Sequence, residues 1–203
     1  MARKKSIKKI EKQQNIVTIP AQEQSLSYQG KVKVQIACGN KIISTKNYNN
    51  SGLPILFKFL SYVLAGHYYS HLRPCKLAIF KCVDTGDNKV APVNFNWETV
   101  KEQNKLYTAS PYVVYDATPT VLATANGYAT TFRFKIPYNW LYLKSFNTMG
   151  LFTENNEVCA YYLFKKEEGT GDSKQIVWDT QNLEDAVGNY SLIIEWTMEI
   201  SNK

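Results

Sequence analysis

The two histidines of the chain have the residue type and spacing that could bind a metal ion. His67 and His71 stand four residues apart, and on a helix this spacing would place both imidazoles on one face, where they could bind Zn²⁺. Gly66, however, is expected to end a helix before them, and no carboxylate stands between them or just after them. We therefore predict two exposed or capping histidines and no metal site.

Paired carboxylates, the residues of general acid–base catalysis, occur at two places. Glu167 is followed by Glu168, and Glu184 by Asp185, and both pairs lie near residues that favour turns. Without a cleft to hold them, such pairs are explained as solvated acids, and a hydrolytic or carbohydrate-binding domain stays open as a third class of function. The segment 169–171 lacks the rest of a phosphate-binding pattern, so we interpret it as a hairpin tip. Because no serine or cysteine has the context of an activated nucleophile, we predict no enzyme activity, no catalytic residue and no cofactor.

The four cysteines are scattered along the chain and form no CxxC pair. They are Cys38, Cys75, Cys82 and Cys159. Four cysteines so widely spaced do not make a disulfide scaffold. We expect them to be small buried hydrophobic side chains of a protein made in a reducing cytosol, without a cleaved secretion signal.

Positive charge is concentrated at the N-terminus. The first dozen residues hold six basic side chains against the single acid Glu11, within a net charge of +7 for the whole chain. The rest of the chain is therefore close to neutral, which indicates docking through one end. The sequence predicts that residues 1–29 form a flexible basic arm. Its expected docking residues are the cations and two apolar anchors, namely Arg3, Lys4, Lys5, Ile7, Lys8, Lys9, Ile10 and Lys12.

Two other interpretations of this arm stay open. The six cations could neutralise phosphates of a nucleic acid, and such binding would be salt-sensitive and blind to sequence. The segment could also be a solvated tail with no partner.

The composition predicts one domain with a sizeable core. The chain has 203 residues, of which 44% are hydrophobic and 13% aromatic, and aromatic residues favour strands. No apolar run approaches the roughly 20 residues that a membrane-spanning helix needs, so we expect no membrane partner.

Alternating apolar and polar residues predict most of the strands. The clearest are expected over residues 31–37, 128–136 and 190–200, with a central strand, apolar on both faces, over 158–164. Residues 41–46 should return from the first strand as a hairpin. Further strands are expected over 76–83, 112–115 and 120–125, with loops over 47–52 and 84–88 and an excursion over 89–110.

One apolar helix is predicted over residues 53–65. Pro54 suits its first turn, Gly66 can close it, and leucines recur at helical spacing. A helix this apolar should be covered on more than one side. Together these elements predict that residues 30–203 form a mainly β fold, a jelly-roll-like antiparallel β-sandwich with one packed α-helix.

The order of these segments resembles virion structural proteins of tailed bacteriophages, especially the crAss-like phages of gut bacteria. The resemblance is carried by short segments, namely 49–53 leading into the helix that ends Leu64-Ala65-Gly66, the strand 77–79, and 149–152, 158–161 and 192–197. The turn 84–87 and the long segment 89–110 depart from that pattern.

The resemblance implies a structural component of a virus particle. A capsid auxiliary protein, a head-fibre protein and a tail-associated protein are all compatible with it. We therefore expect a virion protein that binds neighbouring virion proteins through its N-terminal arm and forms a homo-oligomer. The alternative is a capsid protein whose basic arm binds packaged nucleic acid.

Overall fold

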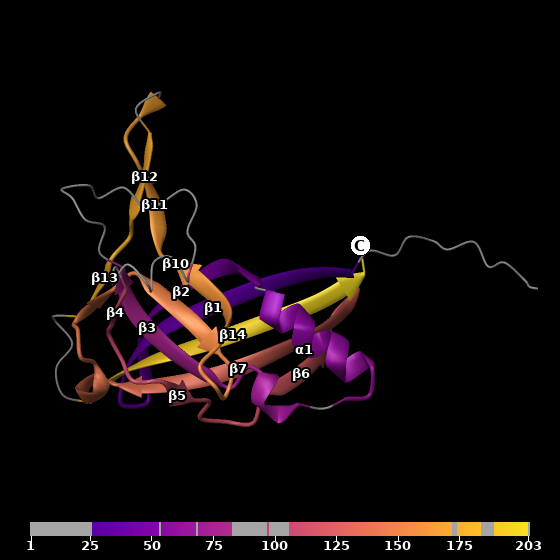
Figure 1. Cartoon of the computed structure of the whole chain (residues 1–203). Helices are drawn as coiled ribbons and strands as arrows, with labels where there is room; N and C mark the ends of the chain where they lie inside the picture. Colours follow the sequence, from indigo (N-terminus) through magenta and orange to yellow (C-terminus); the bar gives the residue numbers. More distant parts are fainter. Residues whose placement is uncertain are drawn as a thin grey trace, which may run out of the picture.

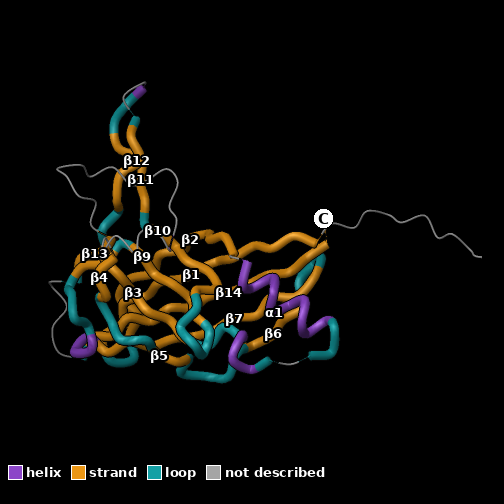
Figure 2. Tube along the Cα trace, in the orientation of Figure 1, coloured by secondary structure: helices purple, strands orange, loops and turns teal. Residues whose placement is uncertain are grey.

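The fold is known from a computed structural model of the chain. The structure describes residues 26–52, 54–67, 69–82, 97, 106–171, 174–183 and 189–202. Strands dominate these residues, as Figure 2 shows.

Five antiparallel strands make the first layer of the fold (Figure 1). In spatial order they are β2 (Lys41–Gly52), β1 (Leu26–Cys38), β14 (Tyr190–Asn202), β7 (Gly127–Pro137) and β6 (Thr120–Ala123). β1 and β14, the first and last of these strands along the sequence, pair over their whole lengths, with Leu26 opposite Asn202 and Cys38 opposite Tyr190.

The second layer contains five further strands. They are β4 (Leu106–Thr108) and β5 (Val113–Val114), which both pair with β3 (Lys76–Cys82), followed by β9 (Thr148–Phe152) and β10 (Val158–Leu163). The long strand β2 joins the layers, because its last residues Ser51 and Gly52 pair with β10. At the opposite border the backbone N–H of Asp116 donates to the carbonyl of Arg133 in β7, 2.8 Å away. The predicted mainly β, antiparallel sandwich is thereby confirmed.

The main core fills the space between the two layers. Trp196, Ile194 and Phe134 enter it from the first layer and are fully buried. Ile79 and Met149 face them from the second layer and are fully buried as well. In β7 and β14 the buried residues that enter this core recur at every second position, so the faces predicted for these two strands are confirmed.

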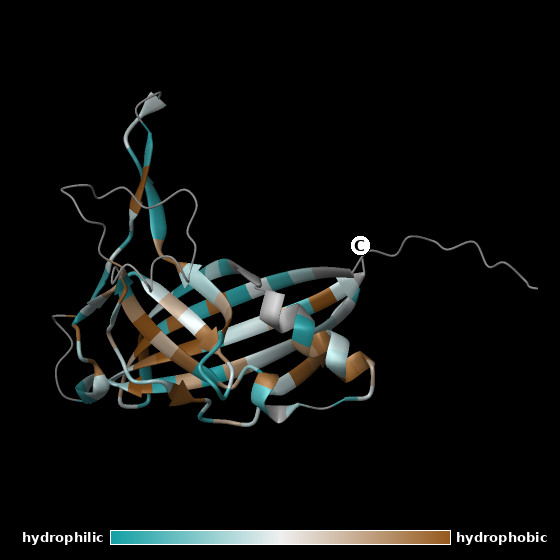
Figure 3. Cartoon of the chain, in the orientation of Figure 1, coloured by the Kyte–Doolittle hydropathy of each residue, from teal (hydrophilic) through white to brown (hydrophobic). Residues whose placement is uncertain are grey.

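A second, smaller cluster covers the outer face of the second layer. It is built around Phe80, Phe152 and Trp97, and the indole of Trp97 lies 5.3 Å from the ring of Phe80, centre to centre. Gly150 makes room for it, because a Cβ there would stand 2.6 Å from the Phe152 ring and 3.2 Å from the Trp97 indole. The second layer is therefore buried on both faces, and Figure 3 shows hydrophobic residues concentrated on it.

The helix α1 (Pro54–Leu64) matches its prediction to within a residue at each end. Gly66 closes it with a φ of +78°, a left-handed conformation that costs glycine little. Phe59 and Leu60 are half-buried, whereas Leu64 is 83% exposed. The side of the helix that carries Leu64 is therefore not covered by any described part of the chain. No described helix has the length and apolar character needed to span a membrane.

Two segments differ from their predictions. Residues 47–52 belong to β2 and form no loop, because Asn47 and Asn49 pair with Lys33 and Lys31 of β1. A long neighbouring strand here outweighs the low strand preference of asparagine. The first strand also begins at Leu26, so residues 26–29, which the sequence assigned to the arm, pair with β14.

Short elements complete the fold. They are η1 (Ser70–Leu72), η2 (Tyr138–Trp140), β8 (Ser145–Phe146), β11 (Lys165–Glu168), β12 (Gln175–Trp178) and β13 (Gln181–Asn182). The predicted strands over 112–115 and 120–125 are present as β5 and β6. The predicted turn at 84–88 and most of the excursion lie outside the described residues.

Candidate interaction surfaces

The predicted docking residues of the arm lie outside the described residues. The docking role of the cations and apolar anchors between Arg3 and Lys12 therefore stays a prediction. The structure does show where this segment joins the body, because β1 begins at Leu26 opposite Asn202, at one end of the first layer (Figure 1). The chain therefore enters β1 at an end of the sandwich, beside the last residues of β14.

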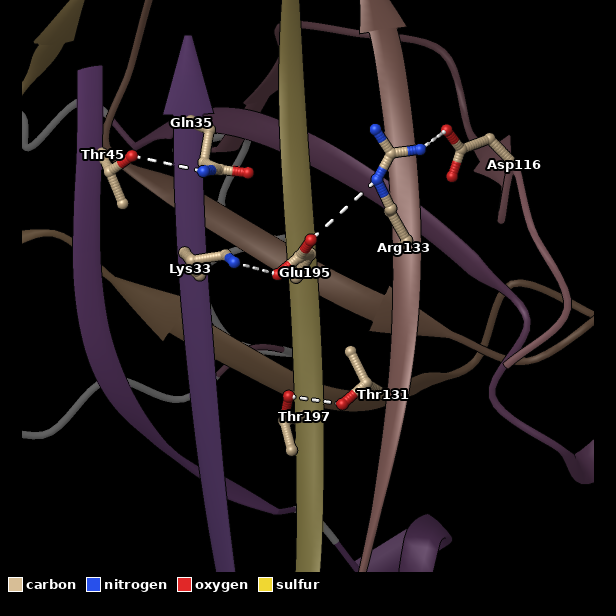
Figure 4. A network of polar contacts seen from close by, with 8 residues as sticks. All are labelled: Lys33, Gln35, Thr45, Asp116, Thr131, Arg133, Glu195 and Thr197. Atoms are coloured by element: carbon tan, nitrogen blue, oxygen red, sulfur yellow. Dashed lines mark hydrogen bonds and ion pairs between the residues drawn. The ribbon is translucent and has the colours of Figure 1, made fainter. Parts of the chain in front are cut away.

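The outer face of the first layer carries cations that have acids beside them (Figure 4). Lys33 pairs with Glu195 across two neighbouring strands, and the Nε of Arg133 lies 3.9 Å from the same carboxylate. Arg133 also donates to Asp116 over 2.5 Å. Exposed pairs of this kind stabilise a fold by at most about 1 kcal/mol each. Their main consequence is electrostatic, because a face of paired charges is not the concentrated positive surface that phosphate binding uses.

Hydrogen bonds between uncharged side chains lie on the same outer face of the first layer. The hydroxyls of Thr131 and Thr197 lie 2.8 Å apart, and the amide of Gln35 donates to Thr45 over 3.2 Å (Figure 4). Such cross-strand pairs hold neighbouring strands together.

The hairpin formed by β11 and β12 stands away from the sandwich (Figure 1). Gly169 and Gly171 have φ values of 102° and 58°, and they lie between the two strands, so the predicted hairpin tip is confirmed. Glu167 and Glu168 are exposed here. The carboxylate of Glu167 lies 3.2 Å from the Nζ of Lys174, and the carboxylate of Glu168 lies 2.6 Å from the Nζ of Lys166. They are lysine-paired acids of a projecting strand, while the second predicted pair, at 184–185, lies outside the described residues.

The two histidines are exposed and flank one aromatic ring. The ring centre of Tyr69 lies 6.3 Å from that of His67 and 5.6 Å from that of His71. Both follow α1, as predicted, and so do not share a helix face. In the described part of the chain no three His, Cys, Asp or Glu residues come together as metal ligands would.

An apolar pocket of about 360 Å³ lies between α1 and one end of the sandwich. Its walls include Phe59 from the helix, Tyr28 and Met198 from the first layer, and Pro119 from the segment before β6. Arg73 is the one charged residue among the described lining residues. Sequence reasoning missed this pocket, because its walls come from segments far apart along the chain.

All four cysteines are described, and none forms a disulfide. Cys75, Cys82 and Cys159 are buried, which confirms the prediction for these three, whereas Cys38 is half-buried. Burial raises the pKa of the Cys159 thiol and, to a lesser extent, that of Cys75.

We expect Cys38 to react first with a thiol reagent in the folded chain. The thiolate is the reactive form, and a raised pKa leaves less of it at any given pH. The other three should react only after unfolding, even near the ordinary thiol pKa of about 8.5. A colorimetric thiol titration before and after adding denaturant would measure this. Rapid reaction of three or four thiols in the folded chain would contradict it.

The arrangement offers surfaces for contact: a projecting hairpin, an apolar pocket, and the exposed edge strand β6. The sequence predicted a strand at β6 but not its place at the edge of the sheet, although one signal was present, since residues 117–132 form the longest run without a charged residue. A comparison of the chain with protein-family models, with curated proteins and with solved structures found no match.

Proposed function

We propose that this chain is a structural component of a bacteriophage virion that docks on neighbouring virion proteins through its N-terminal arm. The observation that carries the proposal is the separation of charge. Six cations lie within residues 1–12, whereas on the outer face of the first layer Lys33 and Arg133 have acidic partners. The concentrated positive charge therefore lies in the part of the sequence that precedes β1, whereas the body offers contact surfaces.

The place where the segment joins the body suits such a role. Thirteen residues, 13–25, separate the last cation from the start of β1. Fully extended, they would span at most about 45 Å. The cations can thus reach a neighbouring protein while the sandwich keeps its own position. Capsid auxiliary, head-fibre and tail-associated positions in a particle assembled in the host cytoplasm are all compatible with this geometry.

Removing charge from the arm should prevent incorporation into particles. The test variant carries Lys4, Lys5, Lys8 and Lys9 replaced by Gln. We expect its copy number per purified particle, measured by quantitative mass spectrometry, to fall at least about tenfold, which corresponds to about 1.4 kcal/mol of docking free energy. The particles are assembled in infected cells that supply only this variant.

The matched control removes the same charge from the body. It carries Gln at four exposed lysines, Lys41, Lys58, Lys135 and Lys174. This control should be incorporated normally. Normal incorporation of the arm variant would refute the docking role. A chain that starts at Leu26 is the complementary test, because starting at Gly30 would remove residues that pair with β14.

Binding of the chain to duplex DNA of unrelated sequence tests the second interpretation of the arm, in which its cations bind nucleic acid. Six cations on DNA would give a slope of roughly −5 in a plot of the logarithm of affinity against that of salt concentration. If the arm docks on protein, the intact chain should show no such binding at physiological salt. A steep slope that disappears in the arm variant would instead favour the packaged genome as partner.

A further inference from the structure

The uncharged run of the sequence coincides with an open edge of the first layer. Charged residues make up 20% of the chain, yet none occurs between Asp116 and Arg133. This run contains β6, the strand at the end of the sheet order, which pairs only with β7 among the described strands. The free edge of a strand presents unpaired N–H and C=O groups to any further strand.

The side chains of this edge are apolar and exposed on both faces of the sheet. Val121 and Leu122 are 62% and 65% exposed, and Tyr128 in the paired strand is 66% exposed. Proteins that remain monomeric usually protect such an edge with lysine, proline or a bulge. Here the nearest proline, Pro119, stands before the strand, and the four residues of β6 are Thr, Val, Leu and Ala.

The absence of charge indicates which partner fits. An acidic or basic partner strand would gain nothing from this edge, because β6 offers no charge to pair with. A neutral strand with small and branched side chains fits it, and a second copy of β6 has these properties. Two identical strands can pair antiparallel about a two-fold axis, so that the same patch is used on both copies.

We propose that β6 is a self-association edge, through which two copies of this chain join their first layers into one continuous sheet. With the two-fold axis normal to the sheet, Val121 of each copy lies on the same face as Val121 of the other. Depending on the register, the two Val121 side chains then lie directly opposite each other or diagonally, displaced by two residues. At either spacing, long side chains at this position can touch each other. The interface is small, so the dimer should be weak and concentration-dependent. This proposal does not depend on docking through the arm.

Opposite charges at one position test the pairing. The full-length chain is prepared as wild type, as Val121→Lys and as Val121→Glu, and its mass is followed by sedimentation velocity over a concentration series. We expect a reversible wild-type dimer, and a dissociation constant at least about tenfold higher for either variant alone, because like charges face each other. A one-to-one mixture of the two variants should associate again as a mixed dimer.

A control on another element shows whether the effect is local. Ile176→Lys changes a side chain that is 45% exposed on the separate β12 strand, and it should leave the dimer unchanged. Circular dichroism confirms that each variant is folded, as expected for substitutions at exposed positions.

Three results would overturn the proposal: a wild-type monomer over the whole series, an unchanged dimer of Val121→Lys, or a mixture that associates no better than its components. Normal self-association of the arm-charge variant would show that this edge and the docking arm act separately.

Discussion

Replacing Trp196 by Ala should cost roughly 3 to 5 kcal/mol of unfolding free energy, the range measured for large aromatic residues removed from cores. Trp196 heads the largest fully buried side chains of the described core. It lies opposite Val32 on one neighbouring strand and Phe132 on the other. Its removal would leave a cavity between both layers that no nearby side chain can fill without moving. Denaturant unfolding, followed by circular dichroism, would measure the loss.

The matched control is a second tryptophan of the same chain. Trp140 is 48% exposed at the end of η2, so Trp140→Ala should change the unfolding free energy by no more than about 0.5 kcal/mol. Equal losses for the two variants would mean that the space between the layers is not the main core. A variant of Trp196 that fails to fold at all would agree with the expectation, and Trp196→Phe, with a smaller cavity, would then give a measurable value.

Much of the first layer could be predicted from the sequence because its two faces meet different surroundings. In β14, Leu192, Ile194 and Trp196 are buried, while Glu195 between them pairs with Lys33. This contrast leaves a period of two that is readable residue by residue. The helix was predictable for a similar reason, since its proline and glycine mark the ends of a helically spaced apolar run.

The second layer was harder because it is buried on both faces. All five residues of β9 are buried, so no polar residue alternates with the apolar ones to reveal a strand. The cluster that covers its outer face depends on Trp97, which reaches the layer from a segment distant in the sequence. No local pattern contains that contact. The course of β2 from one layer to the other is likewise set by partners in β1 and β10.

The candidate interaction surfaces, too, could be predicted from the sequence only in part. Clustered cations near the N-terminus are visible in the sequence alone, although their partner is not. The openness of β6 is a property of the sheet order, and no sequence pattern states which strand ends a sheet. The uncharged run gains its meaning only once the structure shows that Val121 and Leu122 are exposed.

A buried asparagine connects the strands of the second layer in a way that the sequence did not indicate. Asn147 is 2% exposed and lies between β8 and β9. Its side-chain oxygen accepts from the backbone N–H of Cys82 over 2.7 Å, and its side-chain nitrogen donates to the carbonyl of Cys82 over 2.8 Å. Its own backbone N–H donates to the carbonyl of Phe80 over 3.0 Å. One amide thus serves both backbone groups at the end of β3.

Replacing Asn147 by Leu should therefore destabilise the chain by roughly 2 to 6 kcal/mol, because two buried backbone groups lose their partners at about 1 to 3 kcal/mol each. Leucine is similar in size, so the loss reports hydrogen bonding more than cavity formation. Asn139→Leu is the control, since Asn139 is exposed and should change stability by about 0.5 kcal/mol at most. Equal midpoints of denaturant unfolding for both variants would show that water or a shifted backbone can satisfy Cys82, and that the amide of Asn147 does not secure the end of β3.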